Sequence, residues 1–184
     1  MPFNTESMVG FQEREEEAKK ASRIAEDKYI LEITDAELFD NNGFPRLRLG
    51  HRTVAAAGQG TAGRFHTEFL GWFASETSSS PKPIEERNRV IRRMTTEKLQ
   101  GYLKSLEYSP TSDQDLGVNL DECITALKDI EEPSEAGEYL QAIGDMLVGQ
   151  LITGQIKYSK TGDFVNLYAL NYDESIGAAD AVAV

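Results

Sequence analysis

The chain has 184 residues, of which 40% are hydrophobic and 27% charged, a composition typical of one soluble globular domain. It contains no run of about 18 apolar residues that would span a membrane, and its start lacks the basic and then apolar order of a signal peptide. The single cysteine, Cys123, excludes an internal disulfide and a cysteine-based zinc site. We therefore expect a cytoplasmic protein that holds no metal and no cofactor.

The charge is distributed unevenly along the chain. The whole molecule carries −12, but residues 45–104 contain 11 Lys and Arg against 5 acids, a net charge of +6. A positive segment between acidic flanks is typical of a protein that holds a polyanion on one surface and repels it elsewhere. The alternative is ordinary solvated charge without a ligand.

The first part of the chain is predicted to form an arm, a helix and a hairpin. Residues 1–11 predict a loose arm, and Gln12–Asp27, rich in Glu, Lys and Ala, predicts a helix. From Lys28 the apolar period changes to two residues. This change predicts a first strand that ends in a hairpin turn at residues 40–43.

The second and third predicted strands each have two distinct faces. The second strand turns Leu47 and Leu49 to one side. Its opposite side carries three arginines, Arg46, Arg48 and Arg52. The third strand alternates between two sets, with Phe65, Thr67, Phe69 and Phe73 on one face and His66, Glu68, Leu70 and Trp72 on the other. We expect His66 and Trp72 to point outward on the same side of the sheet as the arginines.

The loop between these strands, residues 55–63, matches the spacing of a dinucleotide-binding fingerprint at Gly58, Gly60 and Gly63. That fingerprint requires a helix after the loop, because the pyrophosphate sits on the helix N-terminus. Here the loop leads into the alternating residues of a strand. We therefore expect a mobile connection, flanked by Arg52 and Arg64, that follows an extended nucleic-acid backbone.

The rest of the chain predicts a linker at residues 75–83, a helical insertion over 84–146, and strands over 148–158 and 164–172. Within the insertion we expect a break near Thr95 or Thr96, and a capping box that starts a later helix at Asn119. Residues 173–184 predict a disordered acidic tail. This order is that of a five-stranded antiparallel OB-like barrel, in a mostly β (α+β) domain over residues 28–172. Other all-β and α+β folds share the strand count.

No group of residues predicts catalysis or metal binding. His51 and His66 are expected on opposite faces, so they do not predict a shared metal or an acid–base pair. The stretch 113–119 resembles a calcium loop, but its glycine comes one position early, and Ile124 stands where the loop needs a bidentate Glu. We expect a surface loop at 113–119 and a protein that is not an enzyme.

Cations and aromatic rings on one side of the sheet predict binding of single-stranded nucleic acid, because cations track phosphates and rings stack on bases. The predicted contact residues are Arg46, Arg48, Arg52, Arg64, His66, Trp72, Lys157, Lys160, Phe164 and Tyr168. The alternative is that Trp72, Phe164 and Tyr168 pack under the helical insertion.

Four stretches of turn and core residues also match a known pattern. They are residues 29–33 with their hairpin, 63–65, 99–103, and 143–151 followed by 162–166. Over about residues 28–172 the chain resembles a family of small phage proteins, described as a domain of unknown function and encoded near recombination and replication genes. The resemblance implies an OB-type single-stranded-DNA-binding protein. The chain departs from the family's pattern in its long acidic N-terminal helix and its longer helical insertion. Bacterial single-stranded-DNA-binding proteins and their phage analogues often end in an acidic tail with a terminal aromatic residue, whereas this chain ends at Val184.

We therefore expect a phage-type protein that binds single-stranded DNA during replication or recombination, largely without sequence preference, in the cytoplasm of the host cell. Its expected partners are single-stranded DNA and phage recombination or replication proteins, and the sequence is compatible with an oligomer. The alternative is a non-enzymatic protein-interaction or virion-assembly module whose acidic surface docks a basic partner.

Overall fold

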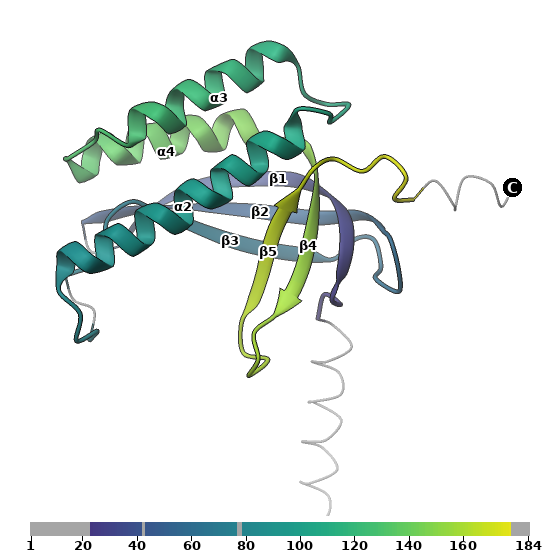
Figure 1. Ribbon diagram of the computed structural model, residues 1–184, viewed down its shortest axis with the longest axis horizontal. Coiled ribbons are helices and arrows are strands. Elements are labelled where there is room, and N and C mark those ends of the chain that lie inside the picture. Colours follow the sequence, from purple (N-terminus) through teal and green to yellow (C-terminus); the bar gives the residue numbers. More distant parts are fainter. Residues whose placement is uncertain (1–22, 42, 77–78, 178–184) are drawn as a thin grey trace, which may run out of the picture.

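A computed structural model describes residues 23–41, 43–76 and 79–177 of the chain (Figure 1). Five strands form one antiparallel sheet in the order β3-β2-β1-β4-β5. The strands are β1 (Asp27–Asn41), β2 (Phe44–Ala56), β3 (Phe65–Gly71), β4 (Leu151–Tyr158) and β5 (Val165–Leu170). Three helices lie between β3 and β4 in the chain, namely α2 (Ile84–Leu106), α3 (Gln114–Leu127) and α4 (Pro133–Leu147).

The helices cover one face of the sheet in two layers. α4 packs across β1 and β2, α2 packs against β3, β4 and β5, and α3 lies on α2 and α4 (Figure 1). Gly144 allows α4 to approach the sheet closely, because a Cβ atom at that position would lie 2.8 Å from the Cβ of Ala36. None of the helices in the described part of the chain covers the other face of β1, β2 and β3, which we call the outer face.

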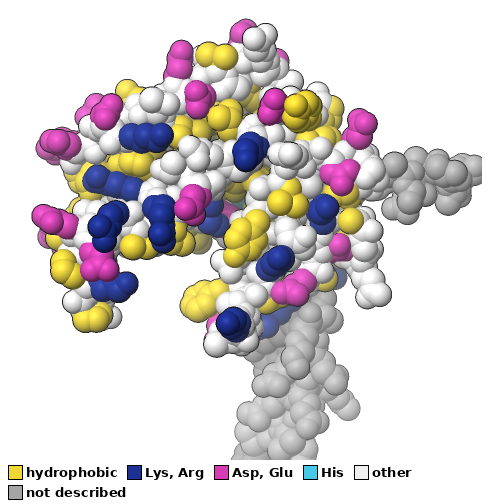
Figure 2. Space-filling view, in the orientation of Figure 1, with side chains coloured by type: hydrophobic (Ala, Val, Ile, Leu, Met, Phe, Trp, Pro, Cys, Tyr) yellow, Lys and Arg dark blue, Asp and Glu magenta, His cyan; other side chains and the backbone are white. Residues whose placement is uncertain are grey.

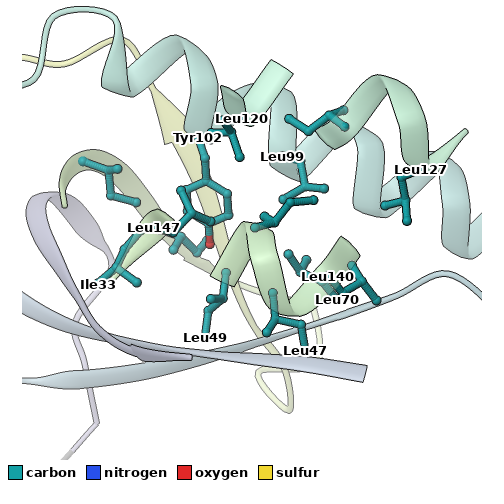
Figure 3. Close-up of a cluster of buried hydrophobic side chains, with 14 of the residues drawn as sticks. Ile33, Leu47, Leu49, Leu70, Leu99, Tyr102, Leu120, Leu127, Leu140 and Leu147 are labelled. Atoms are coloured by element: carbon teal, nitrogen blue, oxygen red, sulfur yellow. The ribbon is translucent and has the colours of Figure 1, made fainter. Parts of the chain in front are cut away.

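The core lies between the sheet and the helices. Each element contributes large side chains with almost no exposed surface, and ten of them are labelled in Figure 3: Ile33, Leu47, Leu49, Leu70, Leu99, Tyr102, Leu120, Leu127, Leu140 and Leu147. Burying a residue of this size stabilises the fold by about 1.5–3 kcal/mol. The alternation of apolar and charged residues therefore determines which side of β2 faces the core, since Leu47 and Leu49 are both fully buried while Arg52 is exposed.

Most of the predicted elements are present. The α+β class, the five antiparallel strands and the helical insertion between the third and fourth strands are confirmed. The described residues form no hydrogen-bonded ladder between β3 and β5, so the sheet is not closed into a barrel. Most of the predicted helix over residues 12–27 lies outside the described residues, and residues 23–26 are not helical.

Two predicted boundaries inside the insertion are wrong. α2 continues through Thr95, because the Thr95 hydroxyl donates 2.6 Å to the carbonyl oxygen of Gly71 and does not cap a new helix. α3 begins at Gln114, before Asn119, because the carboxylate of Asp113 accepts a hydrogen bond from the Leu116 amide at 2.7 Å. The acidic residue that we assigned to a surface loop is therefore the N-cap of a helix.

The predicted tail is partly ordered. Ile176 is 8% exposed, and the amide of Asp173 donates to Thr153 Oγ1 at 2.9 Å, so the chain continues to pack on the sheet after β5. Residues 178–184 lie outside the described residues. Among the described helices, none combines the length and the apolar character that crossing a membrane requires.

Candidate nucleic-acid interface

The three arginines of β2 lie on the outer face, but two of them are paired with acids of β1. Arg48 Nη2 donates to Asp35 Oδ1 at 2.7 Å and lies 3.3 Å from Glu37 Oε2. Arg52 is paired with Glu32. Arg46 forms no hydrogen bond or ion pair within the part of the chain that the structure describes. Arg46 is thus the arginine of this strand whose charge is free to attract an anion.

The prediction placed the two faces of β3 the wrong way round. His66 and Trp72, expected outward, face the helices and are 9% and 2% exposed. The guanidinium of Arg92 on α2 lies 5.6 Å from the Trp72 ring centroid and donates to the Trp72 carbonyl oxygen. Neither His66 nor Trp72 is available to a ligand on the outer face.

The exposed aromatic residues of β3 are two phenylalanines on the face opposite His66 and Glu68. Phe65 is 70% exposed and Phe69 is 55% exposed. Across the β2–β3 ladder, Phe65 pairs with Arg52 and Phe69 pairs with Arg48. Two exposed rings on β3 therefore lie directly opposite two guanidinium groups on β2, and exposed rings beside cations are typical of a surface that stacks the bases of a single strand.

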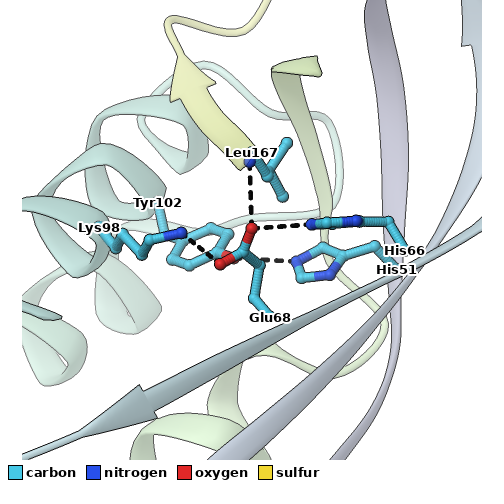
Figure 4. Close-up of polar contacts among 6 residues, drawn as sticks. All are labelled: His51, His66, Glu68, Lys98, Tyr102 and Leu167. Atoms are coloured by element: carbon cyan, nitrogen blue, oxygen red, sulfur yellow. Dashed lines mark hydrogen bonds and ion pairs between the residues drawn. The ribbon is translucent and has the colours of Figure 1, made fainter. Parts of the chain in front are cut away.

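Glu68 explains why β3 turns the face that carries His66, Glu68 and Leu70 toward the helices. Its carboxylate accepts hydrogen bonds from His66 Nε2 at 2.8 Å and from the Leu167 amide of β5 at 3.1 Å, and it is also paired with Lys98 of α2 (Figure 4). Burial favours a raised pKa for Glu68, but the hydrogen bond from His66 and the charge of Lys98 outweigh it and hold the pKa below its usual value. A buried carboxylate with these partners is stable in its ionised form.

The two histidines lie on the same face, contrary to the prediction. His51 pairs with His66 across the ladder, and their ring centroids are 6.0 Å apart. His51 Nε2 lies 2.9 Å from the Tyr102 hydroxyl (Figure 4). Burial, helped by the neighbouring His66, lowers the pKa of His51 to about 4, so the ring is neutral at physiological pH. Burial also raises the pKa of Tyr102. This pair belongs to the core.

The hairpin between β4 and β5 carries the remaining predicted contact residues at its surface. Phe164 is 70% exposed and Tyr168 is 53% exposed, so these two rings do not pack under the helices. Lys157 and Lys160 are exposed as well. Because Glu68 joins β3 to Leu167 of β5, Phe69 and Tyr168 lie on either side of the seam between the two edge strands.

The glycine loop between β2 and β3 is attached to β1 and does not form the mobile connection that we predicted. Asp27 Oδ2 accepts hydrogen bonds from the amides of Gly58 at 2.9 Å and Gly60 at 2.7 Å. A side chain at Gly60 would collide with the ring of Tyr29. The glycines therefore serve the approach of the loop to Asp27 and Tyr29. Arg64, at the end of the loop, hydrogen-bonds Thr53 and Thr61.

The surface charges are separated between parts of the fold. Figure 2 shows Lys and Arg side chains gathered over α2 and at the β4–β5 hairpin, while Asp and Glu side chains lie along α3. Residues 107–150, which contain α3 and α4, carry 11 Asp and Glu against a single Lys. In the described part of the chain, no three His, Cys, Asp or Glu residues are grouped so that they could hold a metal ion.

Sequence comparisons add no relative to this description. No family model matches the chain, and no curated protein matches it. What the chain does has to be inferred from the chemistry of its own residues.

Proposed function

We propose that this protein binds single-stranded DNA through the outer face of β2 and β3, largely without sequence preference. The observation that carries the proposal is the pairing of the exposed Phe65 and Phe69 with Arg52 and Arg48 across the ladder. Stacking on an aromatic ring tolerates every base, because each base has a π-face. Arg46 and the hairpin residues Lys157 and Lys160 supply the charges that attract phosphates.

We also propose that the fold is a variant of the OB-like barrel in which β3 and β5 meet through a side chain and not through a backbone ladder. In its favour, β1 pairs with both β2 and β4, and three helices are inserted between β3 and β4. Where a closed barrel would have β3 and β5 hydrogen-bonded along their backbones, Glu68 reaches the Leu167 amide. The resemblance of residues 28–172 to small phage proteins supports a role in phage replication or recombination, in the host cytoplasm.

Replacing the exposed rings tests the proposal. Phe65→Ala and Phe69→Ala should each weaken binding to an oligothymidylate by about 1–3 kcal/mol, because each removes a stacking surface. The melting temperature should hardly change, since both rings are exposed. The measurement is fluorescence anisotropy of a labelled oligonucleotide at low salt.

Tyr108→Ala is the matched control for these variants. Tyr108 is 67% exposed, close to the 70% of Phe65, but it lies beyond the end of α2 and away from the outer face. It should leave the affinity unchanged. Equal losses in all three variants would mean that the outer face is not the binding surface.

The second candidate is a protein-interaction or virion-assembly module that docks a basic partner. It is favoured by the net charge of −10 over residues 107–150 and by an apolar pocket of about 630 Å³ between α4 and the β1–β2 hairpin. Leu38, Pro45 and Gly137 line that pocket, and Glu138 and Asp145 also contribute to it. Retardation of an oligothymidylate at low salt separates the two candidates, because an acidic docking module would leave the oligonucleotide free.

A further inference from the structure

A small pocket lies where the outer face meets α2. Its volume is about 180 Å³, and its lining includes Arg46 of β2, Phe69 and Gly71 of β3, and Met94 and Lys98 of α2. Arg46 lies opposite Gly71 across the β2–β3 ladder. Because glycine has no side chain, the space beside the aliphatic part of the Arg46 side chain is left open. The pocket thus begins at one of the two exposed rings and ends at helix α2.

The pocket combines one free positive charge with two apolar surfaces that are open to solvent. Arg46 has no partner within the described part of the chain, whereas the charge of Lys98 is already directed to Glu68. Phe69 is 55% exposed and Met94 is 50% exposed. A flat aromatic ring, a polarisable thioether and a guanidinium fit a nucleotide, whose base is apolar on its faces and whose phosphate is an anion.

We propose that this pocket holds one nucleotide of a bound single strand, with its base against Phe69 and Met94 and a phosphate against Arg46. The inference rests on the proposed function, because the strand reaches the pocket from the ring of Phe69. It extends the binding surface from the sheet onto α2. It also assigns unequal roles to the arginines of β2, since Arg46 neutralises a phosphate while Arg52 is held by Glu32.

The first test adds a charge at the pocket. Met94→Glu places a carboxylate beside the phosphate position and should weaken binding of an oligothymidylate of about 15 nucleotides at least fivefold, measured by anisotropy at low salt. Val118→Glu is the control, because Val118 on α3 is also 50% exposed and the substitution changes the net charge equally. Equal affinities for the two variants would overturn the pocket assignment.

The second test uses the salt dependence of binding and does not depend on Met94 variants folding well. Arg46→Ala should make the slope of log K against log salt shallower by about 0.7, the value for one phosphate contact on a single strand. Arg52→Ala should leave the slope close to that of the unmodified protein. An unchanged slope for Arg46→Ala would contradict the inference even if the outer face binds DNA.

The third test observes the pocket directly. With ¹³C-labelled methionine methyl groups, the Met94 signal should shift on addition of the oligothymidylate, while the signal of Met146 on α4 should not. Thymidine monophosphate in a separate titration tells whether the pocket also takes a free nucleotide. Tight binding of the oligonucleotide with an unmoved Met94 signal would refute the pocket and leave the proposed function standing. Failure of the unmodified protein to bind the oligonucleotide would refute both.

Discussion

Single buried polar residues decide which surface this protein presents to a ligand. Both faces of β3 contain large apolar side chains, so hydrophobicity alone does not choose between them. The choice is made by His66 and Glu68, which are buried together because Lys98 and the Leu167 amide complete their hydrogen bonds. Burying a polar group without such partners costs several kcal/mol. The two phenylalanines are exposed as a consequence.

The buried His51 predicts a pH-dependent stability. Its folded pKa is about 4, below its ordinary value of 6.5, so between these values the unfolded chain binds a proton that the folded protein does not. The free energy of unfolding should therefore fall as the pH drops through this window, by up to about 3 kcal/mol. The groups that face His51 are His66 and Glu68 from β3 and Lys98 and Tyr102 from α2.

Urea denaturation of the protein and of His51→Gln checks this prediction. Between pH 6.5 and about 4.5, the variant should show a flatter dependence of stability on pH, because it lacks the group that takes up a proton on unfolding. The comparison concerns the slope, because the variant also changes the hydrogen bond to Tyr102. The same slope in both proteins would show that His51 is not the group responsible.

At the scale of elements, the seam between β3 and β5 depends on one side chain. Glu68 links β3, β5 and α2, and the described strands have no backbone ladder at this seam. Glu68→Gln leaves the partly buried Lys98 without its counter-charge, and because the Lys98 side chain is 25% exposed, the cost should stay below the roughly 3–5 kcal/mol of a fully buried ion pair. The Leu167 amide should then exchange its hydrogen faster, and the unfolding free energy should fall.

The exposed ion pair of α2 provides the control. Arg93 Nε and Glu97 Oε1 are 4.0 Å apart, with both side chains more than two-thirds exposed. Glu97→Gln should cost no more than about 1 kcal/mol and leave hydrogen exchange at Leu167 unchanged. If Glu68→Gln were equally mild, β5 would be held by its pairing with β4 alone.

The elements themselves were largely predictable, because their signals are local. The alternation of Leu47 and Leu49 with the arginines placed β2 correctly, and the turn residues placed both hairpins. The orientation of β3 was not predictable in this way, since Lys98 lies 30 residues away from Glu68. Thr95 and Asp113 were misassigned for a related reason. A threonine or aspartate can cap a helix or bond elsewhere, and only the packed structure decides which.

At the scale of the whole molecule, the separation of positive and negative charge determines which surface of this acidic protein can bind an anion. A net charge of −12 repels DNA at long range, whereas the cations that Figure 2 shows over α2 and at the β4–β5 hairpin act at short range. Salt at about 0.15 M screens charges beyond about 8 Å, which weakens the distant repulsion of α3 and α4 more than the direct contacts. The acidic helices should therefore restrict binding to the surface around β2 and β3.

The most direct test is the salt dependence of oligothymidylate binding by the unmodified protein. Three to five phosphate contacts predict a slope of log K against log salt of about −2 to −3.5, since each contact contributes about −0.7. Affinity measured by anisotropy should therefore fall steeply between about 50 and 200 mM salt. No binding at the lowest salt, or an affinity that does not change with salt, would contradict the proposal that this protein binds single-stranded DNA.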